Sequence, residues 1–135
     1  MSYPIIDIEG IGPTYAAKLR KVGIHTITDL LEMGSSKKGR EKIAASTSIP
    51  ESLVLTWVNH ADLIRIDGIA AHFAELLEAA GVDSVKELAL RNAEHLHTKL
   101  VQTNDQYGLS GKVPSRESLE AMVAQAKTME RKVTH

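Results

Sequence analysis

Residues 8–19 begin with two glycines that flank one apolar residue, and a proline follows them directly. We call this stretch the first hairpin. Gly10 and Gly12 lack a Cβ atom, so the backbone can turn tightly here and approach another surface closely. Pro13 suits the first position of a helix, where its missing N–H group would have no partner in any case. The pattern predicts a tight turn that opens a helix, whose free amides and macrodipole favour an anion.

The same pattern returns 58 positions later, where residues 66–69 repeat residues 8–11. We call residues 66–77 the second hairpin. The apolar positions of the helix that follows realign at the same offset, for example Leu19 with Leu77. Further along, the apolar positions of residues 54–61 realign with those of residues 119–126 at an offset of 65. Such a repeat indicates two copies of one helical unit.

Apolar residues at helical spacing, and the absence of a convincing strand pattern, predict an all-α fold of about eight short helices, four in each copy. We expect the first repeat to span residues 1–63 and the second residues 64–135, together in one compact domain. In the first copy, the expected helices cover about residues 13–22, 26–33, 37–46 and 51–65.

Composition excludes several classes of protein. The chain has no cysteine, so it has neither disulfides nor thiolate chemistry. No apolar run approaches the roughly 20 residues needed to span a bilayer. The first residues also lack the basic and apolar regions of an export signal. We therefore expect a cytoplasmic protein without a membrane partner.

Charge is nearly balanced overall but not along the chain. The net charge is −1, whereas nucleic-acid-binding domains are usually strongly basic. Residues 10–42 hold seven basic and three acidic side chains, and residues 66–94 hold two basic and six acidic ones. One part of the chain is therefore basic and another acidic.

Three stretches follow one another in a familiar order: Gly10-Ile11-Gly12-Pro13, then Ala16-Ala17-Lys18-Leu19, then Gly23-Ile24 with Thr26. Together they resemble the helix-hairpin-helix motif, especially its versions in DNA polymerase and DNA-repair domains. With residues 57–63 included, nearly the whole chain also resembles an uncharacterised bacterial family of tandem helix-hairpin-helix proteins. That family has no established activity.

The motif resemblance implies binding of the DNA backbone without sequence specificity, through main-chain amides. Carried over by position, the donors are the amides of Gly10, Gly12, Thr14 and Tyr15, with Lys18 nearby. Related hairpins also hold a monovalent cation through backbone carbonyls, which is the one cofactor the resemblance allows. We expect no other metal or cofactor.

We therefore predict a nucleic-acid-binding surface on the first hairpin and the basic residues near it. Its members are Gly10, Ile11, Gly12, Thr14, Tyr15, Lys18, Lys21, Lys37, Lys38 and Arg40. The stretch of residues 35–40 combines hydroxyls, lysines and free amides at a helix start, which suits phosphate. The alternative for that stretch is a solvated loop with ordinary surface charge, and we favour this alternative.

The second hairpin departs from the pattern. Ala70 replaces Gly12, Leu76 replaces Lys18, and Glu75 adds a negative charge. We expect this copy to be mainly architectural, with Gly68, Ile69, Ala70 and His72 as secondary candidates for contact.

We do not expect an enzyme, because no nucleophile–base order, metal-ligand spacing or Walker-type loop is present. Trp57 lies in an apolar stripe, so we expect it in the core rather than as a platform for bases. The alternative function is a protein-interaction or scaffold module without nucleic acid. Its basic and acidic ends could dock head to tail between molecules.

Overall fold

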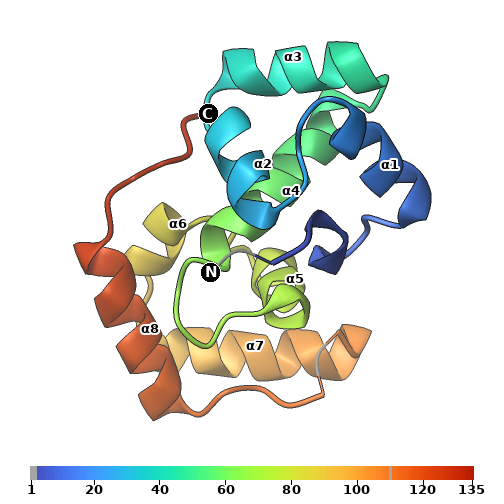
Figure 1. Ribbon diagram of the computed structural model, residues 1–135. Coiled ribbons are helices and arrows are strands. Elements are labelled where there is room, and N and C mark those ends of the chain that lie inside the picture. The colour runs from blue at the N-terminus through green and yellow to red at the C-terminus, as the bar shows by residue number, and fades with distance from the viewer. Residues whose placement is uncertain (1–2, 110) are drawn as a thin grey trace. The chain divides into compact units, whose positions relative to one another are not determined.

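The computed structural model describes residues 3–109 and 111–135 (Figure 1). These residues form eight α-helices, one short 3-10 helix and no strand, so the all-α prediction is confirmed. The helices are η1 (Ile5–Asp7), α1 (Pro13–Lys21), α2 (Ile27–Met33), α3 (Lys37–Thr47), α4 (Glu51–Leu63), α5 (Ala71–Ala79), α6 (Val85–Ala89), α7 (Ala93–Tyr107) and α8 (Arg116–Thr128). No helix in the described residues combines the length and the apolar character that a bilayer span requires.

The chain divides into two compact units. Unit 1 comprises Met1–Asp62 together with Lys132–His135, and unit 2 comprises Leu63–Arg131. The boundary falls within one residue of the predicted end of the first repeat. The return of the last four residues to unit 1 has no counterpart in the repeat pattern.

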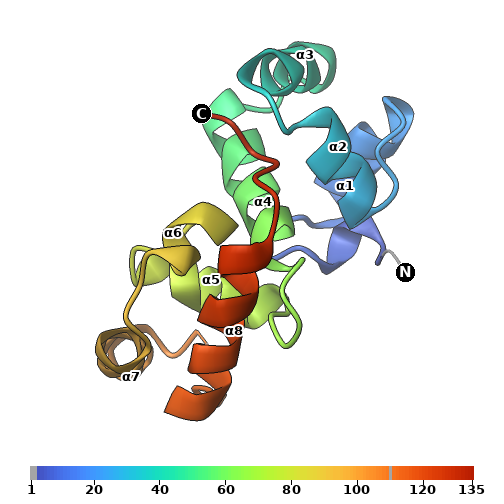
Figure 2. The ribbon, with the colours of Figure 1, turned by 90° about the vertical axis from the view of Figure 1, so that its left-hand side faces the viewer.

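Each unit has its own apolar core. In unit 1, α1 and α2 both contact η1 and α3, and Leu19, Leu30 and Trp57 are almost wholly buried. In unit 2, α8 packs against α6 and α7, and α7 packs against α5 (Figure 2). Trp57 is 1% exposed, which confirms that it belongs to the core. Fully burying a leucine such as Leu19 or Leu30 stabilises the folded state by about 1.5–3 kcal/mol relative to leaving it exposed.

Side chains cap five of the helices at their N-termini. The capping residues are Thr26 for α2, Ser36 for α3, Ser84 for α6, Asn92 for α7 and Ser115 for α8. The two hairpin helices differ, because α1 begins after Gly12 and α5 after Ala70, and neither residue supplies a side-chain cap. The first amides of α1 and α5 therefore have no acceptor from a capping side chain.

A reciprocal capping box starts α2. The Thr26 hydroxyl accepts a hydrogen bond from the Asp29 amide at 3.1 Å, and the Asp29 carboxylate accepts from the amides of His25 at 3.0 Å and Thr26 at 3.1 Å. These bonds, the one from the His25 amide first among them, lower the pKa of Asp29 below its ordinary 3.8. The sequence Thr26-Ile27-Thr28-Asp29 predicts a variant capping box at the start of this helix, and the structure confirms it.

The capping box makes the stability of unit 1 depend on pH. Because the pKa of Asp29 is lower in the folded state, its contribution is complete above pH 3.8 and is lost as the pH falls through the folded pKa. We expect Asp29→Asn to lower the melting temperature at pH 7, and we expect that difference to shrink below pH 3.8. Thermal melts followed by circular dichroism measure both values.

The control is Glu32→Gln, which removes an exposed carboxylate from the same helix but outside the capping box. If Asp29→Asn lowered the melting temperature equally at both pH values, the assigned role of the carboxylate would be wrong.

Candidate nucleic-acid interface

The two hairpins form the same turn. In the first hairpin the Ile11 amide donates to the Ile8 carbonyl at 3.1 Å, and in the second the Ile69 amide donates to the Ile66 carbonyl at 3.1 Å. The glycine inside each turn has a positive φ, +90° at Gly10 and +91° at Gly68. All four isoleucines are buried, so they anchor each turn to its own core.

Only one of the two glycines in the first hairpin is required by the backbone. Gly10 has a φ that residues with a Cβ rarely adopt, and a Cβ there would lie 3.4 Å from Nε1 of Trp57. Gly12 has a φ of −90° and no atom within 4 Å of the position its Cβ would take. Ala70 occupies the equivalent position with a φ of −106°. The turn therefore does not require glycine at position 12.

The start of α1 presents unused amides. The first helical hydrogen bond runs from the Ala16 amide to the Gly12 carbonyl at 2.9 Å. The amides of Thr14 and Tyr15 precede it and have no acceptor within the helix. Thr14 is exposed and Tyr15 is half-buried, so this first turn lies at the surface of unit 1.

Ile11 and Ile69 were predicted to contact nucleic acid, and the structure corrects this prediction. Both side chains are 4% exposed, and both amides already donate within the turn. Neither residue can donate to a phosphate, and their role is to anchor the backbone. The prediction failed because an apolar residue between two glycines was treated as part of the binding loop.

Tyr15 packs against the single tryptophan of the chain. The two rings meet edge to face, with centroids 5.1 Å apart and planes at 62°. Since the indole also lies beneath Gly10, Trp57 supports both the turn and the first turn of α1. The Tyr15 ring is therefore used in packing. The main-chain amide of Tyr15 remains a candidate contact to phosphate.

Two of the three cations of α1, Lys18 and Lys21, lie along one face, and Arg20 lies on another. Thr14, Lys18 and Lys21 share this face because they are spaced four and three residues apart. Lys21 is exposed and Lys18 is half-buried. Cations in the last turn also stabilise the helix macrodipole, so they have a structural benefit independent of any ligand.

The equivalent face of α5 carries no lysine. Its residues are His72, Leu76 and Ala79, and Leu76 is completely buried. Glu75, half-buried, lies between His72 and Leu76 on this helix. The second hairpin therefore keeps the turn of the first without its positive charge.

Arg40 does not belong to the predicted surface. Its side chain is 2% exposed, and its guanidinium donates to the carbonyls of Gly34, Ser35 and Thr134 at 2.9, 3.2 and 2.7 Å. The charge pattern of residues 37–42 could not show this, because Arg40 lies on the inner face of α3 together with Ile43 and Thr47.

Lys37 and Lys38 are exposed but are set apart from the first hairpin. They lie in the first turn of α3. Figure 1 shows that this end of α3 is the one remote from α1. Lys42 lies nearer, because it lines a cleft of about 410 Å³ together with Val22, which follows α1. Lys42 is not among the predicted contacts, although its four-residue spacing from Lys38 places the two lysines on one face of α3.

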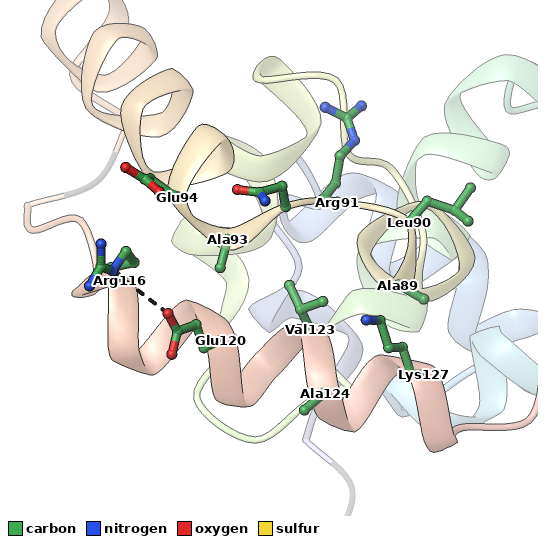
Figure 3. A pocket seen from close by; sticks show the side chains of 11 residues that line it. Ala89, Leu90, Arg91, Ala93, Glu94, Arg116, Glu120, Val123, Ala124 and Lys127 are labelled. Atoms are coloured by element: carbon green, nitrogen blue, oxygen red, sulfur yellow. Dashed lines mark ion pairs between the residues drawn. The ribbon is translucent and has the colours of Figure 1, made fainter.

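A pocket of about 570 Å³ in unit 2 lies between the start of α7 and α8 (Figure 3). Basic and acidic side chains alternate around it, and Arg116 pairs with Glu120 at 3.6 Å. Val123 and Lys127 extend from α8 toward Ala93 and Ala89 across this space. Among the described residues, no three histidine or acidic side chains are grouped so that they could hold a metal ion.

Comparison with known proteins places the chain in a family. Residues 9–129 match the family described as Domain of unknown function (DUF4332), and the chain belongs to that family. A stretch of 55 residues is 43% identical to part of the poly(3-hydroxyalkanoate) polymerase subunit PhaC of Haloferax mediterranei. That stretch covers 41% of this chain and only 10% of the polymerase subunit. No solved structure matches the chain.

The two glycines of the first hairpin should differ sharply in their effect on stability. We expect Gly10→Ala to destabilise unit 1 by about 1–2 kcal/mol, because it forces a Cβ into a left-handed conformation. We expect Gly12→Ala to change stability by less than about 0.5 kcal/mol, because its Cβ would enter open space. Urea unfolding followed by Trp57 fluorescence measures both. Equal effects of the two substitutions would contradict this assignment.

Proposed function

We propose that this member of the DUF4332 family binds the backbone of duplex DNA without sequence preference, and that its first hairpin is a helix-hairpin-helix motif. The observation that carries the proposal is the contrast between the two hairpins. Both have the same turn and an uncapped helix, but only the first combines glycine at position 12 with Lys18 and Lys21. Because an alanine fits the fold at this position, the glycine is better explained by close approach of a ligand.

Phosphate matches the chemistry of this surface. The amides of Gly12, Thr14 and Tyr15 lie at the positive end of the α1 macrodipole, where an anionic oxygen is favoured. Lys18 and Lys21 add the attraction between charges that dominates binding without sequence specificity. Amides and lysines that contact phosphate position a protein on the duplex but do not read base edges. A monovalent cation held by carbonyls of the same turn remains a further prediction.

The corrected set of contacts is small. With Arg40 buried, the remaining cations of α1 are Lys18, Arg20 and Lys21, and those of α3 are Lys37, Lys38 and Lys42. Binding that depends on so few charges should be weak, with a dissociation constant on the order of 10⁻⁴–10⁻⁶ M at physiological salt. Affinity should fall as salt rises, because each neutralised phosphate releases counterions.

Fluorescence anisotropy with a labelled DNA duplex, titrated at several salt concentrations, tests the proposal. We expect Gly12→Ala to weaken binding several-fold at unchanged stability, because its methyl group covers the amides. We expect Lys18→Glu to weaken binding further and to reduce the slope of log K against log salt by about 1. Lys86→Glu, the same charge change at an exposed site in unit 2, is the matched control and should bind like the unaltered protein.

Two results would refute the proposal. One is no measurable binding at a tenth-molar salt or below, and the other is binding that does not respond to salt. Binding that Lys86→Glu weakens as much as Lys18→Glu would show that DNA contacts some other surface.

The alternative proposal is a protein-interaction module. The observation in its favour is that the related segment occurs within a subunit whose name refers to polymerisation of a polyester rather than to nucleic acid. The nearly neutral net charge also suits this function. Static light scattering across ionic strength tests the self-docking form of this proposal. A monomer at low salt would exclude head-to-tail docking of basic and acidic surfaces.

A further inference from the structure

A groove in unit 1 holds a non-helical segment of the chain, residues 132–135. The Thr134 amide donates to the Ser35 carbonyl at 2.8 Å, and the Thr134 carbonyl accepts from Nη2 of Arg40 at 2.7 Å. A ring nitrogen of His135 lies 3.4 Å from Oδ1 of Asn59, which belongs to α4. Peptides bind proteins in this way, through main-chain hydrogen bonds and pockets for side chains.

The pocket of about 570 Å³ in unit 2 is the counterpart of this groove in the repeat. The N-terminal caps of α3 and α7 are 56 residues apart, and α4 realigns with α8 at an offset of 65. At these offsets Ser35 corresponds to Arg91, and Asn59 corresponds to Ala124. Both Arg91 and Ala124 line the pocket (Figure 3). The repeat therefore places the pocket where unit 1 holds a peptide segment.

The floor of the pocket is apolar. Its small and aliphatic lining residues are Ala89, Ala93, Val123 and Ala124. Leu90 lines the same pocket and is 72% exposed. In unit 1 the bound segment supplies the aliphatic side chain of Val133, which is buried. An exposed apolar surface within a charged rim is typical of an interaction site, and an aliphatic side chain of a ligand suits this floor.

The rim of the pocket leaves one cation for a ligand. Two of the lining cations have carboxylate partners, Arg91 with Glu87 at 3.0 Å and Arg116 with Glu120 at 3.6 Å. Lys127 is exposed and extends from α8 across the space toward the end of α6 (Figure 3). A negative charge is therefore favoured beside Lys127, next to the apolar floor.

The opposite end of the pocket has a different charge. Figure 3 shows Glu94 there, together with the pair of Arg116 and Glu120. A second acidic group of a ligand would meet two carboxylates at that end, and like charges repel. The pocket thus suits one acidic residue at the Lys127 end.

We propose that this pocket binds a non-helical segment of another protein in which an aliphatic residue lies next to an aspartate or glutamate. The aliphatic side chain lies on the alanines of the floor, and the carboxylate pairs with Lys127. At the offset of 56 residues Leu96 replaces Arg40, so unit 2 lacks the guanidinium that binds a main-chain carbonyl in unit 1. Recognition in unit 2 therefore depends more on the side chains of the ligand.

This inference gives the protein-interaction proposal a site, and it depends neither on DNA binding nor on self-docking. The pocket belongs to unit 2, whereas the corrected phosphate surface belongs to unit 1. A protein that binds no DNA and stays monomeric in light scattering is still expected to bind such a segment.

Selection from a phage library of random hexapeptides on the immobilised full chain tests the proposal. We expect enrichment of an aliphatic residue next to aspartate or glutamate. The most enriched peptide, synthesised with blocked ends, is then titrated into the ¹⁵N-labelled full chain. Its amide shifts should change at residues 89–94 and 123–127. No enrichment, or changes confined to Ser35 and residues 132–135, would overturn the proposal.

A pair of alanine substitutions on α8 tests the place of binding. Ala124→Trp fills the pocket from an exposed position and should weaken the peptide at least about tenfold. Ala121→Trp, the same change at an exposed position outside the lining, is the matched control and should bind normally. Equal losses in the two variants would contradict this site. Self-association of the unaltered protein that Ala124→Trp abolishes would instead show that a second copy of the chain fills the pocket.

A charge reversal tests the class of ligand. Selection on Lys127→Glu should enrich lysine or arginine in place of the acidic residue, because the charge that faces the ligand has changed sign. Lys86→Glu changes an exposed site of unit 2 outside the pocket and should retain the acidic preference. An unchanged preference in Lys127→Glu would refute the assigned pairing of the carboxylate.

Discussion

The structure depends on a backbone constraint at the start of each hairpin, a turn that holds one glycine at a positive φ. At Gly10 and Gly68 this conformation reverses the chain within a few residues and sends an isoleucine on either side into the core. It also sets the direction in which α1 and α5 leave the turn. Because a Cβ would strain the backbone at both positions, the turn survives in both copies whatever else has changed around it.

Comparing the two copies distinguishes the residues that the hairpin needs for folding from the residues that the fold does not require. The second copy keeps the turn, the buried isoleucines and the uncapped helix start. It replaces Gly12 by Ala70 and Lys18 by the buried Leu76. The fold therefore tolerates a different residue at both positions. Because the first copy has the smaller residue at one position and the positive charge at the other, beside free amides, we propose a phosphate contact in the first copy alone.

Buried polar groups account for the main departures from the sequence-based interpretation. Arg40 stands among lysines in the sequence, and its charge suggested a surface role. In the structure it holds the corner between α2 and α3 and binds the carbonyl of Thr134, 94 residues away. Desolvating a guanidinium is costly, so its hydrogen bonds to three carbonyls matter more than its formal charge. No local pattern contains that information, because the partner lies at the other end of the chain.

The sequence by itself determined the helical class, the bounds of the four helices expected in the first copy to within about two residues, and the capping box at Thr26 and Asp29. These features follow from interactions among residues only a few positions apart, such as periodic burial, capping and the conformations open to glycine. Tertiary structure alone decided that Ile11 is an anchor, that Gly12 is not needed by the turn, and that the last four residues return to unit 1. Those outcomes depend on which distant atoms surround a residue, since burial and hydrogen bonding of a side chain are set by its neighbours in space rather than in sequence.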